Sequence, residues 1–246
     1  MRDRFKAFAI HFSLSALVAL LTLSVVFYGW YPMPLADATG VLSIVGLIVL
    51  VDVILGPVLT FAIYQRGKKS LKLDLAVIVL VQLAALTYGV FTLAEGRPVW
   101  LVYSTDRFDV VRMNELDTRH AEKVKPPYQS SVFAPPRWVT AVPGDDVQEN
   151  SMVTLEAAFA GLDYAQRPYL YHPLSAAAES IKKHAQPLET LKQFNLPDNV
   201  KKQLAPWPEA DAWLPLMATA KPMVVLIKHK TAEVVAIVDL RPWLDK

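Results

Sequence analysis

The chain of 246 residues contains no cysteine. Disulfide bonds, thiol nucleophiles and thiolate metal ligands are therefore excluded from its chemistry. Glycine is scarce in the second half, where only Gly144 and Gly161 follow Gly96, yet fifteen of the eighteen prolines fall there. A region with few glycines and many prolines is expected to have stiffened loops rather than to form a flexible linker.

Hydrophobic residues, by contrast, make up 53% of the chain. They are concentrated in three runs near the N-terminus, each long enough to cross a hydrocarbon core of about 30 Å as a helix. We predict transmembrane helices over residues about 7–31, 41–64 and 73–94, in a membrane domain of residues 1–96. Residues 97–246 are then expected to form a second domain, and the lipid bilayer is the first predicted partner.

The charges predict the orientation of these helices. All seven basic residues of the first 96 lie before the first run or between the second and third, and the loop between the first two runs has none. Basic residues favour the cytoplasmic side, so we expect a cytoplasmic N-terminus and a domain of residues 97–246 in the periplasm. That domain carries 18 basic and 18 acidic residues, which gives no support for nucleic-acid binding.

A cleaved signal peptide is the alternative for the first run, because "ADA" at 36–38 has the small-x-small form of a cleavage site. The run is longer than the about 7–15 residues of a signal-peptide core. Pro32 and Pro34 also separate it from the cleavage motif. These features favour a membrane-spanning helix.

The second domain has the pattern of an α+β fold with antiparallel hairpins. β-branched and aromatic runs predict strands at 98–104, 106–113 and 138–143, and two more at 223–229 and 233–240 are separated by a short turn. Asp146 is expected to cap a helix, with Glu149 reaching back. Met152, Leu155, Phe159 and Leu162 give this helix one apolar face, and Gly161 is expected to end it. Further helices are expected from Ser175 and Pro187.

No catalytic motif is apparent. The patterns G-x-S-x-G, G-x-x-x-x-G-K and H-E-x-x-H are absent, and the five histidines lack ligand spacing. We interpret His11, within the first apolar run, as a surface or packing residue. We therefore predict neither enzymatic activity, nor a metal, nor a cofactor. A Ser-Lys pair brought together only in space stays open, because such pairs need no fixed spacing.

The stretch "VLVDVILGPVLTF" at 49–61 places a carboxylate and a Gly-Pro pair inside the second run. Asp52 and Gln82 lie near the middle of their runs, so they can meet at the same depth. Pro57 removes an intrahelical bond to the Val53 carbonyl, and Gly56 allows another backbone to approach. A carboxylate at this depth costs several kcal/mol unless it faces protein or is protonated.

Three roles for Asp52 remain open. Asp52 can join the three helices through an internal bond to Gln82, or it can dock a foreign helix that carries a polar group. It can also be part of an ion or proton path, although one carboxylate among three helices provides few groups for such a path.

Longer patterns resemble a known family. "LVDVILGPVLTFAIY", "KKSLKLDLAVIVLVQLAALTYGVFTL" and "RPVWLVYSTDRFDVV" are similar to the TfpX/TfpZ family of type IV pilin accessory proteins, most densely over residues 45–112. The resemblance implies a bacterial inner-membrane protein linked to pilin stability and pilus assembly. It carries over no catalytic residue.

The resemblance also implies a partner, the type IV major pilin, whose apolar helix carries a glutamate and a charged amino end. Our hypothesis is a chaperone-like accessory factor in which Gly56 and Pro57 open the helix so that Asp52 and Gln82 receive a polar group of pilin. The alternatives are a membrane-anchored pilin-modifying enzyme and a machinery subunit that does not hold pilin.

A second candidate surface follows the last apolar run. Asp106 and Arg107 are expected to form a tight turn with Phe108 turned into the sheet, or else an edge that meets the globular head of pilin. Arg97, at the start of the second domain, is included in this candidate partner-binding set.

Overall fold

The computed structural model describes residues 1–144 and 146–244, and the chain divides into two compact units. The first unit comprises Met1–Pro32 and Val41–Gly96. The second comprises Met33–Gly40 and the chain from Arg97 onward. The short segment between the first two apolar helices therefore folds with the second unit.

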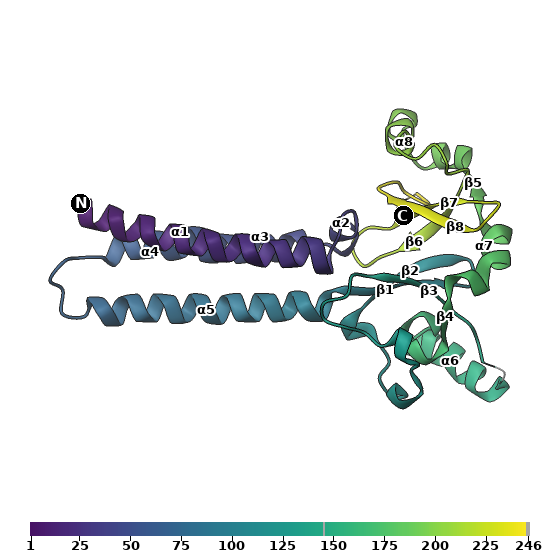
Figure 1. The fold of residues 1–246 in the computed structure, drawn as a ribbon, viewed down its shortest axis with the longest axis horizontal. Helices are drawn as coiled ribbons and strands as arrows, with labels where there is room; N and C mark the ends of the chain where they lie inside the picture. The colour runs from purple at the N-terminus through teal and green to yellow at the C-terminus, as the bar shows by residue number, and fades with distance from the viewer. Residues whose placement is uncertain (145, 245–246) are drawn as a thin grey trace. The chain divides into compact units, whose positions relative to one another are not determined.

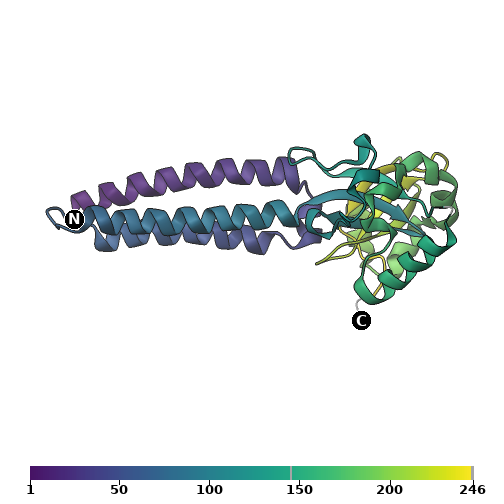
Figure 2. The ribbon, with the colours of Figure 1, turned by 90° about the horizontal axis from the view of Figure 1, so that it is seen from below.

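The first unit contains the three predicted apolar helices, which run side by side (Figures 1 and 2). This part of the prediction is confirmed, since each helix is long and apolar enough to cross a membrane. The first consists of α1 (Arg2–Val25) and a π-helical turn, η1 (Val26–Trp30). The others are the second span, composed of α3 (Leu42–Val49), η2 (Leu50–Leu55) and α4 (Gly56–Ile63), and the third, α5 (Leu71–Gly96).

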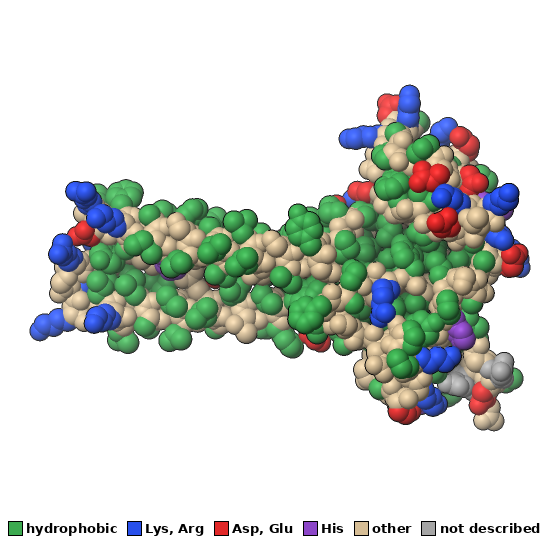
Figure 3. Space-filling view, in the orientation of Figure 1, with side chains coloured by type: hydrophobic (Ala, Val, Ile, Leu, Met, Phe, Trp, Pro, Cys, Tyr) green, Lys and Arg blue, Asp and Glu red, His purple; other side chains and the backbone are tan. Residues whose placement is uncertain are grey.

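Specific contacts hold these helices together. The Arg4 guanidinium donates to the Tyr64 carbonyl at 2.7 Å and so caps the end of α4. A Cβ built on Gly89 would lie 2.7 Å from Ile48, so glycine permits the close approach of α5 to α3. Figure 3 shows hydrophobic side chains along this unit and Lys and Arg side chains at one end of it.

The second unit is built on a curled sheet of eight strands within the described residues, in the order β4-β3-β1-β2-β6-β7-β8, with β5 paired to β6. The β1–β3 and β2–β6 pairs are parallel and the others are antiparallel. The strands are β1 (Pro98–Ser104), β2 (Arg107–Arg112), β3 (Arg137–Ala141), β4 (Tyr171–Pro173), β5 (Gln186–Pro187), β6 (Ala212–Met217), β7 (Met223–Lys228) and β8 (Glu233–Val238).

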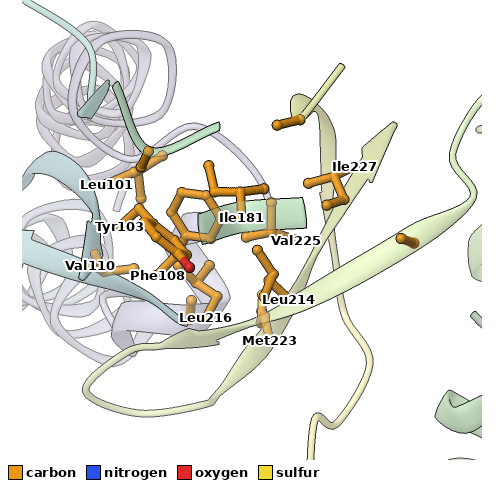
Figure 4. Close-up of a cluster of buried hydrophobic side chains, with 14 of the residues drawn as sticks. Leu101, Tyr103, Phe108, Val110, Ile181, Leu214, Leu216, Met223, Val225 and Ile227 are labelled. Atoms are coloured by element: carbon orange, nitrogen blue, oxygen red, sulfur yellow. The ribbon is translucent and has the colours of Figure 1, made fainter. Parts of the chain in front are cut away.

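Both faces of the sheet are covered by hydrophobic clusters. Alternate residues of a strand point to opposite sides and so enter different clusters. Along β7, Val225 joins one hydrophobic cluster and Val224 joins another on the opposite face. Figure 4 shows the first cluster, in which side chains of β1, β2, β6 and β7 converge with Ile181 of α7 (Ala178–His184).

The segment between the first two spans completes this core. Leu35 and Ala38, from the short helix α2 (Leu35–Thr39), belong to the same cluster. The Ala38 carbonyl accepts hydrogen bonds from the backbone N–H groups of Ala220 at 3.0 Å and Lys221 at 3.1 Å. Gly40 ends α2 with a φ of +72°, and a Cβ built there would lie 2.9 Å from the Ala220 Cβ.

The helix after Asp146 forms as predicted but with the wrong face inward. Asp146 accepts from the Gln148 N–H at 2.8 Å at the start of α6 (Val147–Ala160), and the side chain of Glu149 lies outside the described residues. Its apolar stripe faces outward, with Phe159 87% exposed, while Val153 is buried. The exposed members of the stripe are Met152, Leu155 and Phe159.

The inner side of α6 is held by charge instead. Glu156 accepts hydrogen bonds from Arg119 at 2.7 Å and also pairs with Arg167, whose side chain is 4% exposed. Arg167 and Arg119 also reach the buried Asp117. These two arginines, Arg119 first, lower the pKa of Glu156 to about 2. This polar attachment explains why a periodicity argument chose the wrong face.

The remaining helices depart from the prediction at their ends. The stretch from Ser175 becomes α7, whereas the one from Pro187 is only a 3-10 helix, Leu188–Gln193. An unpredicted helix, α8 (Pro197–Leu204), follows it.

Candidate functional site

The second span carries an irregular turn at the position of its aspartate. Over η2 the helix is π-helical, and the Gly56 N–H bonds to the Val51 carbonyl, five residues back. The next bond in this register would join residue 57 to the Asp52 carbonyl, but Pro57 has no N–H. The orphaned carbonyl is therefore that of Asp52, and not that of Val53 as the α-helical register predicted.

Gln82 of α5 supplies the missing donor. Its Nε2 donates to the Asp52 backbone carbonyl at 3.0 Å. A Cβ on Gly56 would collide with the Gln82 amide, so the glycine makes room for this side chain rather than for another backbone. The four predicted residues Asp52, Gly56, Pro57 and Gln82 thus form one interlocking unit.

Two buried oxygens of this unit have no hydrogen-bond partner within the described residues, namely Asp52 Oδ2 and Gln82 Oε1. The two residues are only 7% and 9% exposed. Unpaired polar atoms in a dry environment cost free energy, so these two oxygens mark this unit as an unusual feature of the spans.

A cavity of about 200 Å³ lies beside these two residues. Asp52 and Gln82 line it, and its other walls are mostly apolar side chains of α1 and α5. A second cavity of about 490 Å³ continues from it and shares His11, Leu14 and Val79. Together they form a groove, which we call the α1–α5 groove. From Asp3 to Val18 along α1 it is about 22 Å long at 1.5 Å per residue.

His11 is a groove residue that the sequence analysis interpreted only as surface or packing. Its Nδ1 lies 2.7 Å from the Thr60 Oγ1 of α4, and the residue lines both cavities. The available signal was weak: a histidine and a threonine near the same ends of two antiparallel helices. Nothing in the local sequence joins two residues so far apart along the chain.

The other predicted site residues belong to the second unit. Arg97 is buried, and its carbonyl accepts from the Met113 N–H at 2.9 Å. Asp106 lies in the β1–β2 turn, and Phe108 is fully buried in the core, as the structural alternative expected. Phe108 therefore offers no surface to a partner, whereas the Arg107 side chain is 43% exposed.

Arg107 lies beside a carboxylate with unusual properties. Its Nε donates to Asp109 Oδ1 at 3.2 Å. Burial nevertheless raises the pKa of Asp109 to about 6, with Arg107 acting in the opposite direction. Desolvation of the charged form thus outweighs the ion pair.

The enzymatic alternative needs a catalytic cluster assembled in space. Ser180 Oγ lies 3.4 Å from His184 Nδ1, and the Tyr103 hydroxyl lies 3.2 Å from the same nitrogen. That nitrogen is also 3.0 Å from the Ser180 carbonyl oxygen, which can only accept. Nδ1 therefore carries the proton and cannot act as a base toward Ser180. Among the described residues, no group of three or more His, Asp or Glu side chains could hold a metal ion.

Comparison with known proteins identifies the family. The family model described as "Fimbrial assembly protein FimB" matches residues 1–40. The chain is 32% identical over 185 residues to the fimbrial assembly protein of Dichelobacter nodosus serogroup E1, covering 74% of this chain and 72% of the relative, with equal values for serogroup I. The relative of serogroups C1 and C2 is 34% identical over 113 residues, or 45% of this chain and 86% of the relative.

No solved structure matches the chain. The predicted relationship to type IV pilus accessory proteins is confirmed by the fimbrial assembly proteins that the chain matches over about three quarters of its length. The chain belongs to the FimB family of fimbrial assembly proteins.

Proposed function

We propose that this protein acts in type IV pilus biogenesis as a non-enzymatic inner-membrane accessory factor, and that its α1–α5 groove holds the transmembrane helix of a major pilin. The observation that carries the proposal is that two polar and mostly buried residues, Asp52 and Gln82, line an otherwise mostly apolar cavity. A helix parked in lipid gains most from a partner that offers apolar contact and satisfies a polar group at depth.

The bond from Gln82 to the backbone carbonyl of residue 52 does not itself require a carboxylate, because an apolar residue at that position would offer the same carbonyl. The groove also has walls from two different spans, which suits a helix lying between them.

The membrane orientation belongs to the same proposal. Basic side chains at one end of the first unit support a cytoplasmic N-terminus. Met33–Gly40 and the chain from Arg97 onward form one compact unit, so both must occupy the same side of a membrane. We assign that side to the periplasm.

Site-specific photo-crosslinking in cells that express pilin tests the proposal. A crosslinker at Ser15, in the groove, is expected to form an adduct with pilin. The control is Leu20, which is 63% exposed and lies on the opposite face of α1 by helical periodicity. An equal yield at both positions, or no pilin adduct at Ser15 with normal expression, would refute the groove as the holding site.

A machinery subunit is the second candidate, favoured by the exposed stripe of Met152, Leu155 and Phe159 on α6. Apolar side chains gathered on one helix face are typical of a protein interface. Replacement of Leu155 and Phe159 by Ser should leave folding intact because both are exposed. A loss of piliation with normal pilin adducts at Ser15 would favour this candidate.

A further inference from the structure

The loop that leads into β3 carries apolar side chains at its tip. Residues 131–134 form a turn, in which the Ala134 N–H donates to the Ser131 carbonyl at 3.3 Å. Val132 and Phe133 lie at the corner of this turn and are 48% and 88% exposed. Turn corners usually hold Gly, Pro, Asn, Asp or Ser, because these residues fit the backbone or bond to it. A valine and a phenylalanine displayed together at such a corner are unusual for a loop that faces only water.

The base of this loop is fixed in place. The Arg137 guanidinium donates to the carbonyls of Pro127 at 2.9 Å and Gln129 at 2.8 Å, so it joins the two ends of the loop. The same guanidinium lies over the Trp100 ring, 4.3 Å from its centroid, and Tyr128 packs edge-on against that ring. The tip is thus presented by a preorganised loop, which loses little conformational entropy when the tip makes a contact.

The composition of the loop is suited to a lipid surface. The stretch PPYQSSVFAPP, between Lys125 and Arg137, has no charged residue, and four of its eleven residues are prolines. Proline has no N–H group that would lose a hydrogen bond to water when the backbone approaches lipid. The Ala134 N–H, at the tip, is already bonded within the turn. Placing this backbone at the boundary of a bilayer therefore leaves few donors without partners.

The loop lies at the end of the sheet at which β1 begins. β3 runs parallel to β1, and Trp100 is paired with Arg137. The chain before Arg137 therefore enters the sheet from the same end as the chain before Trp100. Four residues separate Phe133 from Arg137, and four separate Gly96 from Trp100. Each of these stretches can reach back by about 13 Å when extended.

This end of the sheet is near the boundary of the membrane because of the length of α5. α5 has 26 residues and is about 39 Å long at 1.5 Å per residue. A bilayer with its headgroups is about 40–45 Å thick. The end of a span of this length lies in the headgroup layer, and β1 begins only two residues after Gly96, the last residue of α5. The tip of the loop is within reach of the same layer.

We propose that the turn at 131–134 is an interfacial anchor, in which Val132 and Phe133 insert between lipid headgroups and acyl chains. Apolar side chains on surface elements insert to a depth of about 5–10 Å at this boundary. The anchor requires only that the three spans cross a bilayer. It is independent of the α1–α5 groove, of pilin, and of the side of the membrane on which the second unit lies.

The test uses the full-length protein in lipid nanodiscs with no other protein added. Because the chain has no cysteine, one introduced cysteine carries a nitroxide spin label at a single position. Phe133→Cys is compared with Phe159→Cys, a matched control because Phe159 is also in the second unit and is 87% exposed. Power saturation measures collisions of the label with a polar nickel chelate, which stays in water, and with oxygen, which concentrates in lipid.

The label at position 133 is expected to collide with the nickel chelate at least about fivefold less often than the label at 159, because a polar complex is excluded from lipid. Its collisions with oxygen should increase. Equal, water-like values at both positions would overturn the proposal. Shielding of position 133 that appears only in native membranes containing pilin would overturn it as well, since the turn would then bind a protein and not lipid.

A second label tests the role of the phenylalanine without replacing it. Ser130→Cys keeps Val132 and Phe133, and its label is expected to be partly shielded from the nickel chelate. Adding Phe133→Ser should remove most of that shielding, because an exposed residue is changed and the fold stays intact. Shielding at position 130 that is unchanged by Phe133→Ser would contradict insertion of the turn through its apolar corner.

Discussion

The side-chain amide of Gln82 donates to the backbone carbonyl of Asp52, 3.0 Å away. The bond compensates for the N–H that Pro57 lacks in a π-helical turn. The Asp52 carbonyl thus belongs to the internal contacts between the spans, and Asp52 is also one of the residues that line the groove.

This relationship predicts a suppressor. Gln82→Leu should destabilise the first unit by about 1–2 kcal/mol, because it leaves a buried carbonyl unsatisfied. Pro57→Ala restores a backbone N–H, so the double variant should recover most of that loss. Reversible unfolding of the full chain in mixed micelles measures both. A double variant no more stable than Gln82→Leu would contradict the assignment of the orphaned carbonyl.

The carboxylate should matter for partner binding rather than for folding. Asp52→Leu is expected to lower the yield of the pilin adduct at Ser15 about fivefold or more, the equivalent of about 1 kcal/mol. Asp52→Asn keeps an oxygen acceptor and should lose less. Quantitative blotting of adducts, with piliation scored in parallel, is the measurement. Unchanged adducts and piliation in Asp52→Leu would return Asp52 to a purely internal role.

The contact between Gly40 and Ala220 predicts a stability difference between two glycines of the second unit. Both Gly40 and Gly161 have positive φ, which costs a side-chain-bearing residue about 1 kcal/mol. Gly161→Ala meets nothing within 4 Å, whereas Gly40→Ala also meets Ala220 and should cost more. Ala220→Gly should remove the excess. Thermal unfolding followed by tryptophan fluorescence tests it, and equal costs for the two single variants would count against the contact.

Asp109 predicts an unusual pH dependence. Its pKa of about 6 in the folded state lies above the unfolded value of 3.8, so its penalty to stability grows as the pH rises from about 4 to 6 and is complete above that. Asp109→Asn should therefore stabilise the protein at pH 7.5, by at most about 3 kcal/mol, and much less at pH 4. Urea unfolding at the two pH values measures the difference.

Glu156 supplies the control of opposite sign. Its pKa is lowered to about 2, so its contribution is present above its ordinary value of 4.5 and is lost as the pH falls toward 2. Glu156→Gln should thus weaken the protein at pH 7.5. Stabilisation by Glu156→Gln, or no effect of Asp109→Asn at pH 7.5, would contradict the two pKa shifts.

The sequence predicted the elements whose pattern is local. The three spans follow from long apolar runs, and β1, β2, β7 and β8 from short β-branched ones. It did not predict β6, because Pro215 argues against a strand. At Pro215 the neighbouring strand is β7, because the pairing of β6 with β2 is confined to Leu216 and Met217. The missing N–H of the proline therefore interrupts no bond to β2.

The candidate site was predictable only in part for the same reason. Asp52 and Gln82 could be matched by depth in the membrane, and Gly56 and Pro57 stand out as poor residues for a helix interior. The π-helical register depends on a partner from another helix, and the His11–Thr60 pair joins positions 49 residues apart. Contacts of this kind depend on packing that no single stretch of sequence encodes.

The docking of α2 into the second unit has a consequence for synthesis. Ala38 leaves the ribosome about 180 residues before Ala220, whose N–H it must bind. At about 5–20 residues per second, the delay is about 10 to 40 seconds. During that time the residues of β6 and β7 in the cluster of Leu35 and Ala38 are missing, although all three spans have been synthesised. The part of the second unit that is synthesised first can thus complete its packing only when the last strands have been synthesised.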